Sequence, residues 1–150
     1  MPEYRFYHLQ KHKLDQALPG LVRKAYEGGH KILIHCRDEN HVKALDKHLW
    51  TFHPESFLPH ANGKDKNAEQ QPVLLDTKWD TPNQASVLIE LDRISPQTTG
   101  KFDMICLMFE DWDEDRKKAA RDIWRELKEN PDLELSYWQQ SESAGWEKKQ

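Results

Sequence analysis

Short apolar runs alternate with amphipathic helical patterns along this chain, and this alternation restricts the possible folds more than any other feature. Residues 4–9 (YRFYHL) have a strand pattern, and residues 14–26 then carry apolar side chains at three- and four-residue steps, ended by Gly28 and Gly29. Residues 31–36 (KILIHC) form the continuous apolar run typical of a strand buried on both faces. We therefore expect an α/β fold: a single three-layer domain with a mainly parallel sheet and helices on both faces.

The same alternation continues to the end of the chain. Asp38 is a plausible N-cap for a second helix through Trp50, and Pro19 predicts that the first helix starts or kinks near it. The longest helical pattern covers residues 111–129, and the polar residues 61–71 are expected to form a loop. Residues from about 139 to 150 are expected to form a flexible tail. Further strands are expected at residues 57–59, 73–75, 86–91, 102–108 and 133–137.

Length and charge exclude several classes of protein. The 150 residues suit one domain, and the net charge of −4 argues against generic affinity for a nucleic-acid backbone, leaving an indirect role or a local basic patch. No apolar run reaches the ~18 residues of a membrane span, and the first residues lack the apolar core of a secretory signal. Cys36 and Cys106 lie in separate apolar runs, which predicts buried, reduced thiols. We expect a cytoplasmic protein with no membrane contact.

Nucleotide-binding motifs are missing from the sequence. A phosphate-binding P-loop needs a glycine-rich stretch that ends in Gly-Lys-Ser/Thr, but Gly63-Lys64 precedes Asp65 and Gly100-Lys101 precedes Phe102. A dinucleotide site needs glycines directly after the first strand, where this chain has QKHKLDQ. We therefore expect no nucleotide cofactor.

His35-Cys36 resembles the start of a cysteine phosphatase motif, in which an arginine follows the cysteine at the sixth position. Val42 occupies that position here, and the intervening RDENH holds two acids that would repel phosphate. We favour a buried core cysteine over a catalytic one.

Metal chemistry finds little support in the sequence. Eight histidines are present, and His41 and His48 share one helical face, but no third ligand has matching spacing. We expect surface histidines and no metal. Acidic residues 111, 113, 114 and 115 stand where a helix begins, and the helix dipole explains them.

Two segments are candidate binding surfaces. Residues 45–60 (LDKHLWTFHPESFLPH) combine aromatic residues with prolines, which favour a sheet edge or irregular structure. This segment either closes the core between a helix and a strand or forms an apolar patch that another chain completes. The second segment, the basic stripe, lies on the late helix opposite core positions Ala120, Ile123 and Leu127. It consists of Lys117, Arg121, Trp124, Arg125 and Lys128.

The basic stripe has two interpretations. Nearby acids on the same helix allow an ordinary solvated face with internal ion pairs. Alternatively, the arginines and the indole suit an acidic peptide that carries an apolar anchor.

Residues 45–60 resemble the most characteristic segment of the chi subunit of bacterial DNA polymerase III, which has an LD…LW…ESF.PH pattern there. The resemblance continues through YRFYHL, GHKILIHCRDENHVKALDKHLW, PVLL, SVLIEL and FDMICLMFE at similar spacings, over essentially residues 2–138. A late R..[YW][KR] element matches Arg121, Trp124 and Arg125, although tyrosine is common where this chain has Trp124.

The resemblance implies a nucleotide-binding-like topology without a nucleotide site, and an accessory subunit in DNA replication with no active site, cofactor or metal. It implies binding to the psi subunit of the clamp loader, and to the acidic tail of single-stranded DNA-binding protein (SSB), which ends in phenylalanine. DNA would then be contacted indirectly. The implied psi-binding positions are Trp50, Phe57, Pro59 and His60, and the implied tail-binding positions are Lys117, Arg121, Trp124 and Arg125.

Alternatives to this reading stay open. In some relatives of the chi family a repair helicase occupies the surface that psi takes in others. Two other classes also remain: a direct single-stranded DNA-binding protein that uses the basic stripe, and a small phosphatase-like enzyme that uses Cys36.

Overall fold

The computed structural model describes most of the chain in seven stretches: residues 3–36, 38–51, 60–62, 72–77, 84–91, 102–143 and 145–149. The strand expected at residues 57–59 and nearly all of the loop expected at residues 61–71 lie outside these stretches. None of the helices in the described residues has the length and apolar character needed to cross a membrane.

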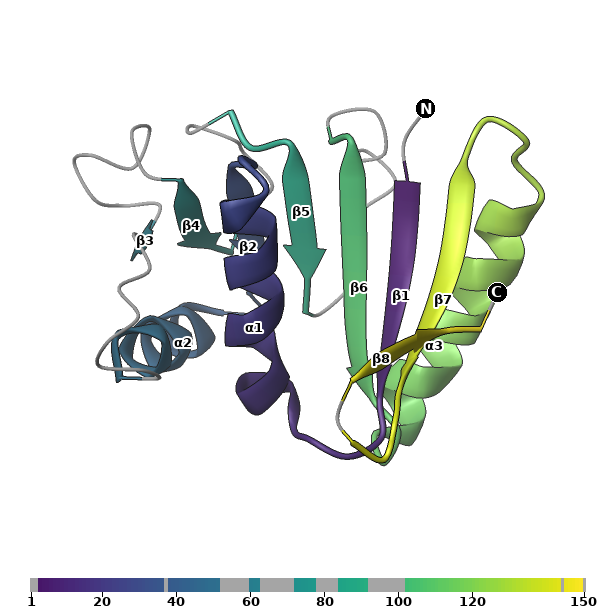
Figure 1. The fold of residues 1–150 in the computed structure, drawn as a ribbon, viewed down its shortest axis with the longest axis horizontal. Helices are drawn as coiled ribbons and strands as arrows, with labels where there is room; N and C mark the ends of the chain where they lie inside the picture. The colour runs from purple at the N-terminus through teal and green to yellow at the C-terminus, as the bar shows by residue number, and fades with distance from the viewer. Residues whose placement is uncertain are drawn as a thin grey trace.

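An eight-stranded sheet forms the centre of the molecule (Figure 1). Its strand order is β3-β4-β2-β5-β6-β1-β7-β8, and every neighbouring pair is parallel except β7 and β8. The strands are β1 (Glu3–Leu9), β2 (Ile32–His35), β3 (His60–Asn62), β4 (Val73–Asp76), β5 (Val87–Glu90), β6 (Met104–Glu110), β7 (Glu134–Gln140) and β8 (Trp146–Lys148).

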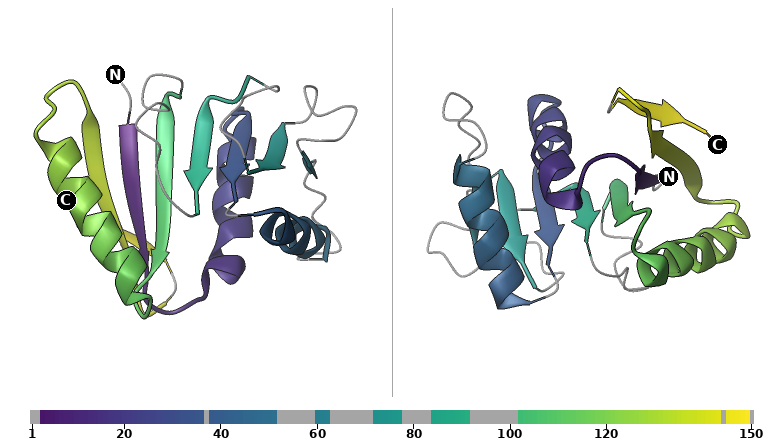
Figure 2. Two further views of the ribbon diagram at one scale, coloured as in Figure 1. Left: turned by 180° about the vertical axis from the view of Figure 1, so that it is seen from behind. Right: turned by 90° about the horizontal axis from the view of Figure 1, so that it is seen from below.

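Helices cover both faces of this sheet, as the sequence predicts. α1 (Leu14–Glu27) and α2 (Glu39–Thr51) pack on one face, and α3 (Glu114–Lys128) packs on the other (Figure 2). Two apolar clusters therefore form, one on each side of the sheet. The first includes Leu18 of α1 and Leu45 of α2, and the second includes Ala120 of α3. The expected three-layer α/β domain is confirmed.

Pro19 lies inside α1 and does not mark its start. The helix begins at Leu14 and runs past Pro19 to Glu27, although proline lacks the N–H that would bond one turn back. Leu18 and Val22, both fully buried, fasten the helix to the sheet on either side of the proline. Apolar burial of this kind offsets the local loss of a backbone hydrogen bond.

The C-terminal segment differs from the expected flexible tail. β7 continues to Gln140, and the chain then turns back so that Trp146 pairs with Gln140 in the antiparallel strand β8. The Trp146 ring packs edge-to-face on Tyr7 of β1, with 5.0 Å between ring centroids. This apolar contact holds a segment whose polar composition predicts fraying.

Candidate docking site on α3

Side-chain capping fixes where α3 begins. Asp113 is the N-cap, and its carboxylate accepts the backbone N–H of Arg116 at 3.2 Å. Glu114 and Asp115 follow in the first turn, where acids favour the positive end of the helix dipole. The explanation as helix-start residues is confirmed for Asp113, Glu114 and Asp115, whereas Asp111 precedes the helix and contacts His8 and Lys117. The described residues contain no group of three or more side chains suited to hold a metal ion.

α3 turns only part of the basic stripe away from the sheet. Ala120 is buried, and Ile123 and Leu127 pack against the same apolar cluster, as the helical spacing predicts. Arg121 and Arg125, in contrast, are exposed to solvent. Neither arginine forms an ion pair with any residue in the described part of the chain.

Trp124 lies between the exposed arginines and the core. Its ring contacts Phe6 edge-to-face at 5.2 Å between centroids and Tyr137 at 5.8 Å, with an interplanar angle of 90° in the second pair. The indole is thus only partly buried and is held in one orientation by two aromatic neighbours. It forms an apolar surface of fixed orientation beside the two exposed arginines.

Lys117 differs from the two arginines. Its side chain is only 17% exposed, and its ammonium group lies 3.5 Å from Asp111 and 3.4 Å from Glu114. An acidic ligand would have to compete with these carboxylates for Lys117. It could bind Arg121 and Arg125 without displacing a carboxylate of the described residues.

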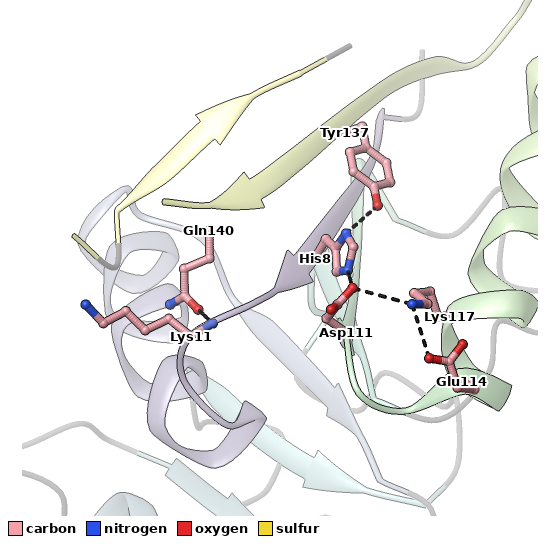
Figure 3. A network of polar contacts seen from close by, with 7 residues as sticks. All are labelled: His8, Lys11, Asp111, Glu114, Lys117, Tyr137 and Gln140. Atoms are coloured by element: carbon pink, nitrogen blue, oxygen red, sulfur yellow. Dashed lines mark hydrogen bonds and ion pairs between the residues drawn. The ribbon is translucent and has the colours of Figure 1, made fainter. Parts of the chain in front are cut away.

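A buried histidine supports this end of α3 (Figure 3). The Nε2 atom of His8 lies 2.7 Å from a carboxylate oxygen of Asp111, and its Nδ1 atom lies 2.7 Å from the hydroxyl of Tyr137. Because a carboxylate can only accept, Nε2–H donates to Asp111, and Nδ1 forms the hydrogen bond with the Tyr137 hydroxyl. Asp111 in turn contacts Lys117, so the network joins β1 and β7 to the basic stripe.

The network changes the acidity of its members. The hydrogen bond from His8, with a smaller contribution from Lys117, holds the pKa of Asp111 below its ordinary value. Partial burial raises the pKa of the Tyr137 hydroxyl, although the nearby charge of Arg121 acts in the opposite direction.

Sequence patterns did not reveal this network. The expectation of surface histidines is wrong for His8 and for His35, which are 6% and 3% exposed. His8 ends a strand, and its partners Asp111 and Tyr137 are more than 100 residues away along the chain, so no local spacing relates them.

His35 and Cys36 lie where three parallel strands end. The Nδ1 atom of His35 is 2.6 Å from the carboxyl group of Glu90, and its Nε2 atom is 3.1 Å from the carbonyl oxygen of Thr77. Cys36 is fully buried, and burial together with the charges of Glu90 and Asp76 raises the pKa of its thiol to about 12. A nucleophilic cysteine requires a lowered pKa, so Cys36 has the opposite of what phosphatase chemistry needs.

The segment of residues 45–60 is described only in part. Leu45 is buried in the core, as predicted, while Phe57 and Pro59 lie outside the described residues. Trp50 belongs to α2 and His60 begins β3, the strand at one end of the sheet, and α2 and β3 contact each other. The backbone thus brings Trp50 and His60 to the same edge of the molecule.

The fold and the α3 face define a class: an α/β protein whose basic helix presents a partly buried tryptophan beside two exposed arginines. Residues 1–133 match the family model described as DNA polymerase III chi subunit, HolC. The chain belongs to this family, a family of accessory subunits of DNA polymerase III that are not themselves catalytic.

Individual relatives carry the same description. The probable DNA polymerase III subunit chi of Rickettsia prowazekii is 30% identical over 89 residues, which are 59% of this chain and 54% of the relative, so the match spans about half of that protein. DNA polymerase III subunit chi of Pseudomonas aeruginosa is 29% identical over 73% of this chain and 75% of the relative. The subunit of the same name in Haemophilus influenzae is 25% identical over 77% of this chain and 80% of the relative.

Proposed function

We propose that this protein is a non-catalytic accessory subunit of DNA polymerase III that acts in the cytoplasm during DNA replication. One face binds the psi subunit of the clamp loader, and the basic stripe on α3 binds the acidic C-terminal tail of SSB. The observation that carries the proposal is the partly buried ring of Trp124 next to Arg121 and Arg125, two exposed arginines that form no ion pair with any described residue.

The chemistry of the α3 face suits such a tail. Arg121 and Arg125 can each pair a carboxylate bidentately, and neither has to leave an ion pair within the described residues to do so. The partly buried ring of Trp124 gives a terminal phenylalanine an aromatic surface with fixed geometry. Lys117 contributes less because Asp111 and Glu114 already neutralise it.

Titration of single variants with a labelled tail peptide tests this assignment. Arg121→Ala should weaken binding about tenfold or more, because a hydrogen bond to a charged group contributes roughly 1.5–3 kcal/mol. Lys117→Ala should have a smaller effect. Lys118→Ala is the matched control, since it removes an exposed positive charge of the same helix from outside the stripe. Unchanged binding by Arg121→Ala would contradict the proposed site.

The psi-binding face rests on Trp50, Phe57, Pro59 and His60. We expect Phe57→Ala to lose psi while it keeps the SSB tail, and Arg121→Ala to show the reverse. Pull-down of each variant with purified psi and with the tail peptide measures both. If one substitution abolished both interactions in a folded protein, the two faces would not be separate.

Salt should distinguish the two contacts. The tail contact depends on exposed charges, which roughly 0.1 M salt already screens beyond about 10 Å, so its affinity should fall steadily as salt is added. The psi contact is expected to be mainly apolar and therefore salt-resistant. Calorimetric titrations of the two partners at low and high salt measure the difference, and equal salt dependence would argue against this division.

A further inference from the structure

A groove runs along α1 on the face of the sheet opposite α3. It consists of two cavities, of about 320 Å³ and 210 Å³, which share Arg5, Tyr7, Leu21 and Lys24 and are therefore continuous. The lining of α1 extends from Gln16 to Gly28, a length of roughly 18 Å at ~1.5 Å per residue. The groove is open and elongated, which suits a linear ligand better than a compact one.

Aromatic side chains form the floor and one wall of the groove. Tyr7 of β1 and Trp138 of β7 lie side by side with nearly parallel rings, 6.2 Å apart between centroids and inclined by 23°. Trp146 of β8 stands against Tyr7 at 75° and forms the wall opposite α1. Trp138 is partly exposed whereas Tyr7 is only 4% exposed, so the Trp138 indole is the surface on which another flat ring can stack.

The charge of the groove is opposite to that of the whole protein. The chain has a net charge of −4, yet the described residues that line the two cavities include no carboxylate. Arg5, His12, Lys24 and His30 lie along the lining. Glu3 neutralises Arg5 in part, at 2.7 Å, whereas exposed Lys24 forms no ion pair with any described residue.

Arg5 also belongs to the aromatic surface. Its guanidinium carbon lies 5.6 Å from the centre of the Trp138 ring, so the charge is held above the indole. An anion bound next to Arg5 would therefore place an attached flat ring close to Trp138 and Tyr7.

Gly20 keeps one side of the groove open. It lies in the interior of α1, where glycine is a poor helix former, and an added Cβ atom there would meet no atom within 4 Å. Neither a close contact nor a positive φ angle requires a glycine at this position. What its missing side chain provides is space in the wall of the larger cavity.

We propose that this groove binds a short segment of single-stranded nucleic acid, with a base stacked on Trp138 and phosphates beside Arg5 and Lys24. Proteins that hold single strands without sequence preference combine a basic groove with aromatic stacking surfaces in this way. The groove lies on the other side of the sheet from the basic stripe. A nucleic-acid strand bound in the groove therefore leaves Arg121, Trp124 and Arg125 accessible to another ligand. The inference goes beyond the proposed function and does not depend on it.

Fluorescence anisotropy of a labelled oligothymidine of about ten nucleotides, mixed with the full-length protein at low salt, tests the groove. Trp138→Ala should weaken binding about tenfold, as expected for the loss of one stacking surface. Lys24→Gln should weaken binding of oligonucleotides of any base sequence by a similar factor. It should also reduce the slope of log affinity against log salt concentration by about 1, as expected for the loss of one phosphate contact.

Two variants that differ only in charge separate an effect on binding from an effect on folding. Gly20→Glu and Gly20→Gln place side chains of nearly the same shape on the same helical position, and only the first adds a negative charge to the groove. Gly20→Glu should bind the oligonucleotide several-fold more weakly than Gly20→Gln. Equal affinity of these two variants would overturn the proposal even if Trp138→Ala failed to fold.

Two further results would also overturn it. If Arg121→Ala lost the oligonucleotide while Lys24→Gln kept it, DNA would bind at the basic stripe instead. If a labelled peptide of mixed aspartate and phenylalanine bound the groove more tightly than the oligonucleotide and displaced it, the groove would be a peptide site. Neither result depends on whether the SSB tail binds α3, since that is measured separately with the tail peptide.

Discussion

His35 and Glu90 form a deeply buried hydrogen-bonded pair, with side chains 4% and 0% exposed and 2.6 Å between the bonded atoms. Surface ion pairs such as Arg23 with Glu27 lie in water and contribute at most about 1 kcal/mol. Removal of one partner from a buried pair leaves the other polar group without that hydrogen bond and away from water, so the loss of stability is larger.

We expect Glu90→Leu to lower the free energy of unfolding by about 1–3 kcal/mol, because the buried imidazole of His35 loses its hydrogen bond to Glu90 and keeps the one to Thr77. The double variant His35→Leu/Glu90→Leu should lose less than the sum of the two single variants, since the apolar side chains can pack together. Urea unfolding of the four proteins measures the difference. Strictly additive losses would contradict the coupling.

Asp111 gives a second prediction at this scale. Its carboxyl should titrate below the usual value of about 3.9, and His8→Gln should raise its pKa more than Lys117→Ala does, because the His8 hydrogen bond is the larger cause. A lowered folded pKa contributes stability above the ordinary pKa, and this contribution is lost as pH falls through the folded value. Carbon-13 NMR titration of the Asp111 carboxyl would show no change in His8→Gln if the network did not form.

At the scale of elements, β8 decides whether the C-terminal end is part of the fold. Three residue pairs join it to β7, and the contact of Trp146 with Tyr7 joins it to the core. Without β8, the aromatic rings of Tyr7 and Trp138 would lose one side of their packing, and the groove would lose a wall.

A chain that ends at Gln140 should therefore be less stable by about 1–3 kcal/mol, the range expected for exposing a large apolar side chain. Trp146→Ala in the full chain should reproduce most of this loss, while Lys149→Ala, which changes only an exposed side chain, should have little effect. Thermal and urea unfolding compare the three. If the truncated chain were as stable as the full chain, the result would support the flexible tail that the sequence predicts.

For the whole molecule, the buried acidic groups predict loss of stability in alkali. Burial raises the pKa of Cys36 and Cys106 from about 9 to about 12 and that of Tyr7 from 10 to about 12. Raised folded pKa values mean that the folded state keeps protons which the unfolded chain releases. Stability is therefore complete below about pH 9 and falls as pH rises toward 12.

At pH 10.5 each thiol should lower the free energy of unfolding by roughly 2 kcal/mol relative to neutral pH, because the change is ~1.4 kcal/mol per pH unit above the unfolded pKa. Urea midpoints between pH 7.5 and 10.5 measure the slope. The variant Cys36→Ala/Cys106→Ala is the control, because it keeps Tyr7 but lacks both titrating thiols and should lose less stability over this range. Parallel slopes in the two proteins would show that the thiols are not the cause.

Local patterns in the sequence determined the elements and their class. The continuous apolar run of β2 indicates a strand buried on both faces, and the spacing of Ala120, Ile123 and Leu127 leaves Arg121 and Arg125 on the exposed side of α3. These predictions hold because strand and helix periodicity depend on neighbours a few residues apart. The family resemblance also follows from the sequence alone, and the match over residues 1–133 confirms it.

Only the tertiary structure decided which distant side chains meet. The pairing of β1 with both β6 and β7 brings His8 to Asp111 and Tyr137, and it places Tyr7 beside Trp138 at the floor of the groove. The order of parallel strands depends on long crossovers and on the burial of both sheet faces, so no short segment encodes it. For the same reason the alternation of strands and helices determined the class of fold, while the tertiary contacts decided which arginines stay free, which histidines are buried and where the groove opens.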